Sequence, residues 1–104
     1  MPQVTRQTER VLAALLRDPS GPRYGLELGR ETGLKSGTLY PILARLEGAG
    51  WVVSEWERID PSVEGRRPRR YYRLTRTGEK VAHGAVRETE SHLRGLLRPE
   101  VQAS

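Results

Sequence analysis

Apolar side chains recur near the start of the chain at the spacing of one helix face. The positions involved are Val4, Thr8, Val11, Leu12, Leu15 and Leu16. Steps of three and four residues place such side chains on the same side of an α-helix, so they predict an amphipathic helix over residues 5–17. A turn follows at residues 18–22, where two prolines and a glycine interrupt the helical hydrogen bonds.

Two shorter helices are predicted next, separated by a turn of a few residues. The first spans residues 24–32 and carries Gly25 and Gly29 in its interior, where each glycine costs about 1 kcal/mol relative to alanine. We therefore expect another helix to approach it closely at these two positions. Gly33 suits the C-terminal cap, because glycine adopts the left-handed conformation without strain.

The second of these helices begins near residue 36 and ends at the glycine-rich segment 48–50. Ser36 or Thr38 is expected to cap its N-terminus with a side-chain oxygen. Pro41 is expected in the first turn, where its missing N–H group costs least. The buried stripe has i, i+3, i+4, i+7 spacing and consists of Leu39, Ile42, Leu43 and Leu46.

A β-hairpin is predicted after this helix. Residues 51–57 contain two tryptophans and two valines, and residues 70–74 contain two tyrosines, a composition typical of strands. About a dozen residues separate the two strands, including Pro61, Gly65 and Pro68. A hairpin loop of that length usually has a function or is mobile.

A long helix is predicted over residues 76–98, with Thr75 as its N-cap. Small and apolar positions repeat in it in steps of four and three, a heptad spacing typical of packing against another helix. These positions are Ala82, Val86, Thr89, Leu93 and Leu96, and Leu97 widens the seam. Residues 99–104 are expected to form a frayed tail.

The order of elements is helix, helix, short turn, helix, hairpin and long helix, which is the order of a winged helix-turn-helix. We therefore predict a mainly α fold with a small β-hairpin. Residues 1–75 would form the DNA-binding domain, and residues 76–98 would form a dimerisation helix. In such a fold the third helix fits the major groove of DNA, which is about 12 Å wide, and the wing reaches neighbouring phosphates.

Charge and composition agree with a nucleic-acid partner. Eighteen basic and thirteen acidic residues give a net charge of +5, and the whole excess falls in residues 1–78, a distribution that suits a polyanion. Sixteen of the basic residues are arginine. This preference suits bidentate contacts to phosphate and guanine, and it is equally the signature of a GC-rich genome.

Several other classes are excluded by what the sequence lacks. It has no cysteine and no apolar run long enough for a membrane span, so we expect a cytoplasmic protein without a membrane partner. It has no glycine-rich phosphate loop and no pattern of nucleophile and base. Two histidines, His83 and His92, cannot complete a metal site alone. We expect neither enzyme activity nor a cofactor.

Four stretches of the sequence resemble the PadR family of bacterial transcriptional regulators. They are Tyr24-Gly25-Leu26-Glu27-Leu28, the segment from Ser36 to Glu47, Gly50-Trp51, and the segment from Arg67 to Thr75. The resemblance covers about residues 8–80, and the single C-terminal helix matches a short subgroup of the family. It implies a homodimeric winged-helix repressor whose last helix, helped by the first, forms the dimer. It also implies that some relatives bind small aromatic or drug-like effectors.

The predicted elements and the resemblance together indicate the site residues. DNA contacts are expected at Tyr24, Lys35, Ser36, Gly37, Thr38, Tyr40, Pro41, Arg45, Arg66, Arg67, Arg69 and Arg70. The four wing arginines are the strongest candidates, because such a cluster repels itself unless an anion is bound. Dimer contacts are expected at Val11, Leu15, Ala82, Val86, Thr89, Leu93, Leu96 and Leu97.

Structural alternatives stand beside these functional interpretations. Ser36 and Thr38 equally suit capping, Tyr40 suits half-buried packing, and Arg45 suits an ion pair. Trp51 and Trp56 fit either packing between wing and helices or a platform for a ligand. For the whole protein we expect a homodimeric repressor on an inverted-repeat operator, with or without a small hydrophobic or aromatic effector. The alternative is a winged-helix protein-interaction module that does not bind DNA.

Overall fold

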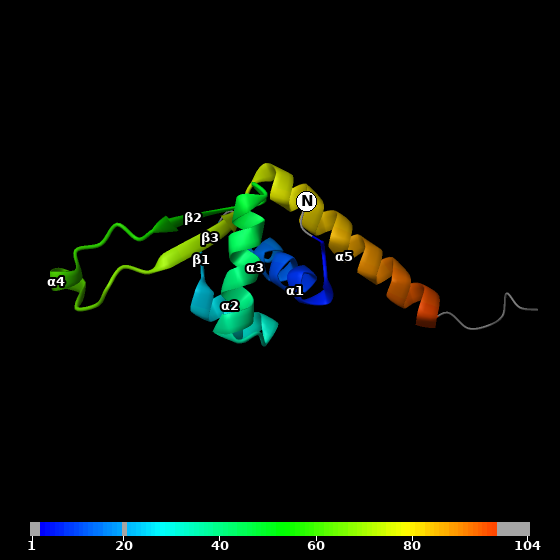
Figure 1. Cartoon of the computed structure of the whole chain (residues 1–104), viewed down its shortest axis with the longest axis horizontal. Coiled ribbons are helices and arrows are strands. Elements are labelled where there is room, and N and C mark those ends of the chain that lie inside the picture. Colours follow the sequence, from blue (N-terminus) through cyan, green and yellow to red (C-terminus); the bar gives the residue numbers. More distant parts are fainter. Residues whose placement is uncertain (1–2, 20, 98–104) are drawn as a thin grey trace, which may run out of the picture.

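The computed structural model describes residues 3–19 and 21–97, so the predicted tail at 99–104 lies outside the described residues. The elements are α1 (Arg6–Leu16), β1 (Arg23–Tyr24), α2 (Gly25–Thr32), α3 (Ser36–Gly48), β2 (Val52–Trp56), α4 (Pro61–Glu64), β3 (Arg70–Leu74) and α5 (Arg76–Leu97) (Figure 1). This order confirms the predicted winged helix-turn-helix. β1 and α4 were not predicted, because elements of two and four residues are too short to show a hydrophobic period.

The three strands form one antiparallel sheet in the order β1-β3-β2. β2 and β3 pair along their whole length, with Trp56 opposite Arg70 at the outer end. β1 adds two residues to the other side of β3 and places Tyr24 opposite Tyr71. Beyond the sheet the loop over residues 57–69 continues outward to α4. The wing, which consists of β2, this loop and β3, and helix α5 point to opposite sides of the helical body (Figure 1).

The core lies between the first three helices, the sheet and the beginning of α5. Its largest fully buried side chains are Leu12, Leu15, Leu28, Leu39, Leu43, Leu46, Val11 and Val52. The apolar stripes predicted for the first and third helices are thus confirmed. A buried arginine, Arg23, donates to the carbonyl of Ala14 at 2.6 Å and pairs with Glu31, which ties the end of α1 to α2.

Of the two glycines expected to let another helix approach α2, only Gly25, the first residue of the helix, packs tightly against a side chain of α3. A Cβ atom at Gly25 would lie 2.2 Å from the hydroxyl oxygen of Tyr40, so a larger residue there requires the Tyr40 side chain to move. At Gly29 the expected Cβ position lies 3.5 Å from the carbonyl oxygen of Leu34 and 3.8 Å from a methyl carbon of Leu39, which are ordinary contact distances, so the packing there does not require glycine. Gly33 ends the helix at a φ of 73°, the left-handed conformation expected of its cap.

The start of α3 corrects two predictions. Lys35 is the N-cap residue, and its carbonyl oxygen accepts the N–H groups of Thr38 and Leu39, both at 2.9 Å. Because Ser36 and Thr38 already lie inside the helix, neither hydroxyl caps it. Pro41 is the sixth helical residue rather than a first-turn residue, and it leaves the carbonyl of Gly37 without its helical N–H partner.

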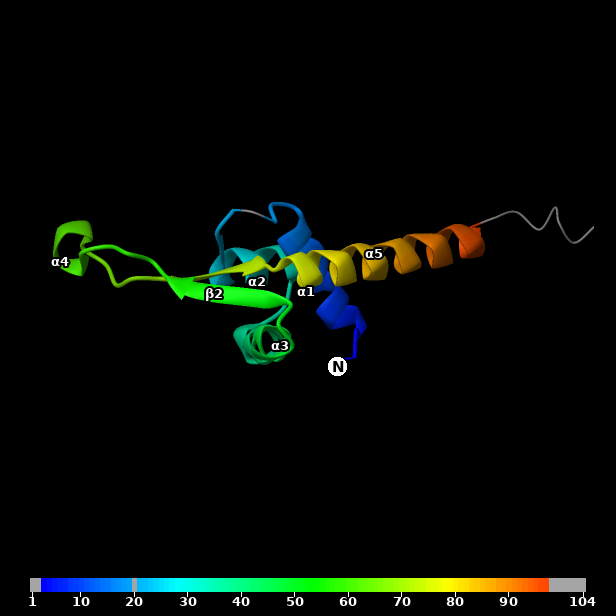
Figure 2. The same ribbon diagram turned by 90° about the horizontal axis from the view of Figure 1, so that it is seen from above.

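Thr75 begins α5 as predicted, because its hydroxyl accepts the N–H of Gly78 at 3.0 Å. The same hydroxyl donates to the carbonyl of Gly50 at 2.7 Å, which fixes the helix to the end of the hairpin. From there α5 runs beside α1 (Figure 2). The Thr89 hydroxyl hydrogen-bonds the carboxylate of Glu9 on α1.

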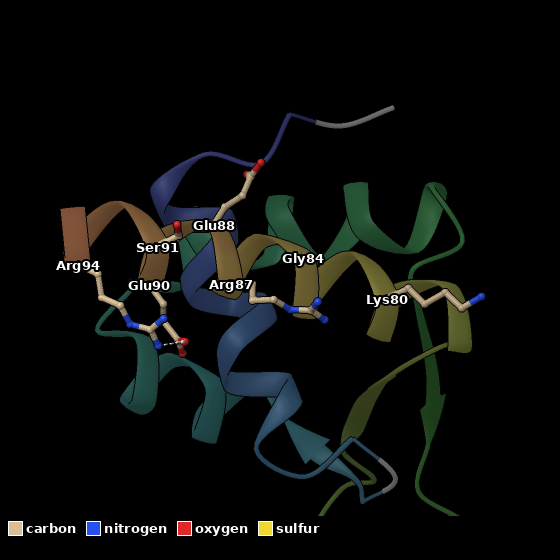
Figure 3. Close-up of a pocket in the computed structure, with 7 residues that line it drawn as sticks. All are labelled: Lys80, Gly84, Arg87, Glu88, Glu90, Ser91 and Arg94. Carbon is tan, nitrogen blue, oxygen red and sulfur yellow. Dashed lines mark ion pairs between the residues drawn. The ribbon is translucent and has the colours of Figure 1, made fainter. Parts of the chain in front are cut away.

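The outer half of α5 has one apolar side and one polar side. Leu93, Leu96 and Leu97 are 50%, 67% and 81% exposed. The polar side forms a shallow hollow lined by Lys80, Gly84, Arg87, Glu88, Glu90, Ser91 and Arg94 (Figure 3). Arg94 and Glu90 form an ion pair of 3.8 Å there. Within residues 3–19 and 21–97, no helix is both long and apolar enough to cross a membrane.

Candidate nucleic-acid interface

Most of the DNA-contacting residues expected on α3 lie at its N-terminus and first turns, whereas Arg45 lies in the last turn. Lys35, Ser36, Gly37, Tyr40, Pro41 and Arg45 are exposed, and Thr38 is half-buried. The core stripe occupies the opposite side of the same helix. The N-terminus of a helix carries positive partial charge and free N–H groups, which favour anions. The structure therefore gathers these residues on a surface that suits a polyanion.

The four wing arginines do not share one environment. Arg66 forms an ion pair with Glu57, with 2.6 Å between Nη1 and Oε1. Arg70 lies 3.7 Å from a carboxylate oxygen of Glu47 on α3 and donates to the Ser54 hydroxyl at 2.9 Å. Both guanidinium groups are therefore partly neutralised within the chain.

Arg67 and Arg69 keep their positive charge for an external partner. Among the described residues neither side chain pairs with a carboxylate. The Arg69 guanidinium lies over the ring of Tyr24, 5.9 Å from the centroid, a contact that holds the group without cancelling its charge. The far end of the wing is acidic instead, because Asp60 and Glu64 belong to the α4 region. The self-repelling cluster expected from the sequence is thus reduced to these two cations.

Glu57 organises the base of the wing. Its carboxylate accepts hydrogen bonds from Arg66, from the Tyr24 hydroxyl at 3.1 Å and from the backbone N–H of Arg69 at 2.8 Å. The Arg66 guanidinium, supported by the other two donors, lowers the pKa of Glu57 from 4.5 to about 2. In return, the hydrogen bond to Glu57 raises the pKa of Tyr24.

Glu57 was not predicted as a site residue, because a single glutamate forms no pattern in the sequence. Its position opposite Arg69 depends on the strand register, in which the Glu57 N–H donates to the Arg69 carbonyl at 2.9 Å. The only sequence signal was its place at the end of a predicted strand that precedes an arginine cluster. The Tyr24 hydroxyl, expected to contact DNA, donates to Glu57 in this structure, so Tyr24 supports Arg69 from beneath.

The residues expected at a dimer interface separate into two groups. Val11, Leu15 and Ala82 have no exposed surface and belong to the core of the chain. This burial corrects the expectation that they contact a partner subunit, because they have no surface to offer. Val86 and Thr89 are half-buried near α1. The remaining three, Leu93, Leu96 and Leu97, are the exposed leucines of α5.

A hollow of about 460 Å³ connects the exposed side of α3 with the wing. Tyr40 from α3 lines it together with Arg69, Arg70 and Trp56 from the wing, and with Gly25 from the start of α2. The helix and the wing therefore border one continuous surface in which aromatic rings alternate with guanidinium groups. Such a combination suits nucleic acid, whose backbone is anionic and whose sugars and bases offer apolar faces.

Comparison with known proteins gives a family match for most of the chain. Residues 11–84 match the family model described as "Transcriptional regulator PadR-like family". No protein among those with curated functions matches the chain.

Solved structures provide similar folds. A protein of Streptococcus mutans UA159 is 27% identical, with a TM-score of 0.69, and the match covers 85% of this chain and 79% of that one. A PadR-like transcription factor from Bacteroides fragilis is 25% identical, with a TM-score of 0.64 and coverage of 88% and 89%. NadR in complex with 4-hydroxyphenylacetate is 26% identical, with a TM-score of 0.66 and coverage of 88% and 60%.

Proposed function

The chain belongs to the PadR-like family of transcriptional regulators, and from this premise we propose that it is a homodimeric repressor that binds a specific DNA operator. Members of the family regulate transcription and are not enzymes. The observation that carries the proposal is the shared hollow, because it joins Tyr40 of α3 to Arg69 and Arg70 of the wing. One duplex lying against this surface meets the reading helix and the wing together.

The two parts of the surface have different tasks in this mechanism. The exposed side of α3 enters the major groove, where Lys35, Ser36 and Thr38 face base edges and Tyr40 faces the backbone. Arg67 and Arg69 neutralise phosphates, which contributes affinity but no sequence preference. Repression follows when the occupied operator overlaps the promoter. The alternative of a protein-interaction module is disfavoured, because two cations without carboxylate partners in the described part of the chain suit a polyanion better than a protein surface.

A second copy of the chain is the proposed occupant of the apolar side of α5. Leu93, Leu96 and Leu97 continue the heptad positions of this helix beyond the body of the protomer. Twofold pairing of these leucines places two reading helices on one face of DNA. The operator then consists of inverted half-sites about 34–36 Å apart.

The test of this function combines DNA binding with solution mass. Binding to duplex DNA, measured across salt concentrations, should weaken with a slope of about −0.9 per neutralised phosphate. Leu96→Asp should convert a two-chain mass into a one-chain mass and weaken operator binding, because a charge replaces a leucine of the dimer interface. Arg87→Ala on the polar side of α5 is the matched control and should keep the dimer. A wild-type protein that has the mass of one chain and binds no duplex would contradict the proposal.

A small aromatic acid is the effector that we propose, on the basis of one hollow. About 520 Å³ lie between α1 and α5, lined by Arg6 and Arg10 and also by the carboxylates Glu9 and Glu88, so two guanidinium groups border a space next to the proposed dimer helix. NadR, which has a similar fold, carries 4-hydroxyphenylacetate. Release of DNA by aromatic acids, abolished in Arg10→Ala, would support this regulation. Unchanged DNA binding across a panel of such acids would contradict it.

A further inference from the structure

One face of the hairpin continues outward from the core as a row of polar and aromatic side chains. The row begins at Val52 and Leu74, both buried, and ends at Trp56 and Arg70. Alternation along a strand puts Ser54 and Trp56 on the same face as these core residues. The end of the row lies outside the core and lines the hollow between the wing and α3.

Arg70 is held in place from three sides. Its Nε donates to the Ser54 hydroxyl at 2.9 Å, and Nη2 lies 3.7 Å from a carboxylate oxygen of Glu47. Its guanidinium carbon lies 5.5 Å from the centroid of the Trp56 ring. The distance to Glu47 is long for an ion pair, so a closer anion can replace that carboxylate at little cost. Arg70 is thus positioned in advance for an external anion.

The hollow also exposes a large apolar surface beside this arginine. Trp56 is 59% exposed, and Leu26 and Tyr40 are exposed as well on the same hollow. A deoxyribose offers apolar C–H groups, and the phosphate attached to it requires a cation. The pairing of an open indole with an oriented guanidinium therefore matches one sugar–phosphate unit.

We propose that Trp56 and Arg70 form a clamp for the sugar–phosphate backbone of the DNA strand that passes between α3 and the wing. Trp56 packs against a deoxyribose, and Arg70 binds the adjoining phosphate together with the Tyr40 hydroxyl. This proposal rests on the proposed DNA-binding function and adds a contact site to it. Because the ligand is the backbone, the contact is the same on every sequence.

Tryptophan fluorescence tests the clamp directly, because the chain has only two tryptophans. Trp51 is 3% exposed and Trp56 is 59% exposed, so acrylamide reaches mainly Trp56. A mixed-sequence duplex of roughly 40 base pairs, about four helical turns, should reduce quenching of the wild-type protein at low salt. In Trp56→Phe the emission comes from Trp51 alone, and the same duplex should leave its quenching unchanged.

Affinity provides the second measurement. Trp56→Ala should weaken binding to all duplexes alike by about tenfold, because the deoxyribose loses one large apolar contact, whereas Trp56→Phe should retain most of the affinity. Arg70→Lys keeps the charge but removes the planar group, and should fall between them. Val53→Ala, on the opposite face of the same strand, is the matched control and should stay within about twofold.

The outcomes separate the clamp from the function on which it rests. If duplex DNA binds but Trp56 stays equally accessible and Trp56→Ala binds normally, the clamp is wrong and the regulator proposal survives. If the wild-type protein binds no duplex, both fail. If an aromatic acid protects Trp56 while duplex DNA does not, the hollow is a small-molecule site and the clamp is overturned. Circular dichroism of each variant excludes unfolding as the cause of a loss.

Discussion

Glu57 determines how much of the positive charge of the wing remains available to a partner. It neutralises Arg66 and holds the backbone of Arg69, while the guanidinium of Arg69 stays over Tyr24. The wing therefore presents its remaining cations on a base that is fixed by an anion. Glu57 therefore neutralises only one arginine of the cluster and otherwise holds the backbone of the wing in place.

The pH dependence of stability should reveal this support. The pKa of Glu57 falls from 4.5 to about 2 on folding, so its contribution is complete above about pH 4.5 and is lost as the pH falls toward 2. The difference in melting temperature between the wild-type protein and Glu57→Gln should therefore shrink as the pH falls from 5 to 3. Glu64→Gln, at the far end of the wing, is the control. A constant difference across this range would contradict the assigned role of Glu57.

Arg67 and Arg69 should act on DNA directly, whereas Arg66 should act on the wing itself. Replacing Arg67 or Arg69 by alanine should weaken binding to all duplexes and reduce the salt slope by about 0.9 for each phosphate that is no longer neutralised. Arg66→Ala should instead disturb the wing, because it removes the main partner of Glu57. Titrations of anisotropy against salt, combined with hydrogen exchange of residues 57–69, distinguish these effects. Equal behaviour of all three variants would mean that the ion pair with Glu57 has no importance.

At the residue scale, the sequence predicted correctly those residues whose role follows from burial or from their position at the end of a helix. The stripe of α3 and the cap residues Gly33 and Thr75 were predicted correctly. The partners of individual charged residues were not predicted, because they depend on the register of the hairpin. Residues far apart in the chain, such as Glu47 and Arg70, meet only after the strands pair.

At the scale of elements, the junction between the hairpin and α5 has the least room for change. A Cβ atom at Gly78 would lie 1.8 Å from the carbonyl oxygen of Trp51. This contact is with backbone, which cannot rotate away as a side chain can. The first turn of α5 is therefore in tight contact with the backbone at the inner end of the hairpin, where β2 begins. We call this contact the joint between the hairpin and α5.

A pair of glycine substitutions in the same helix tests this joint. Gly78→Ala should lower stability by about 1–3 kcal/mol, the range of overpacked sites. Gly84→Ala meets nothing within 4 Å and should raise stability by about 0.5–1 kcal/mol, because alanine favours the helix. Thermal unfolding of both variants should thus shift in opposite directions. A stabilised Gly78→Ala would show that the backbones at this joint can separate.

Elements with a clear period were predictable, and the exceptions have physical reasons. The helices follow the 3.6-residue period, and β3 was predicted with its observed bounds. β1 exists only because β3 supplies hydrogen-bonding partners to two residues of the chain. The start of α3 near residue 36 was predicted correctly, but its cap was not, because Lys35 is the N-cap residue and no side chain caps the helix.

At the scale of the whole molecule, the wing and α5 extend in opposite directions from one body (Figure 1). In the proposed dimer the leucines of α5 lie at the centre, so each wing points away from the twofold axis. The distance between the two reading helices is then set by α5 alone. This arrangement predicts strict dependence on the spacing of half-sites.

Operators with altered spacing test that dependence. Insertion of about five base pairs between the half-sites turns one of them to the opposite side of the duplex and should reduce affinity to that of a single half-site. Insertion of a full helical turn puts both half-sites on the same side of the duplex again but leaves them too far apart, so it should recover little of the affinity. Footprinting on these duplexes measures both effects. Equal affinity for all spacings would indicate flexible coupling between the two protomers.

The contact between Arg70 and Glu47 has a consequence for how the DNA-sequence preference of such a protein can change in evolution. Glu47 lies on the helix that reads bases, and Arg70 lies on the strand that grips the backbone. This contact joins the two parts in the free protein, and in the proposed clamp a phosphate takes the place of the Glu47 carboxylate. Ser36 and Thr38 take no part in that contact. Substitutions at these two positions can therefore change the bases that are read without changing how Arg70 is held in the free protein.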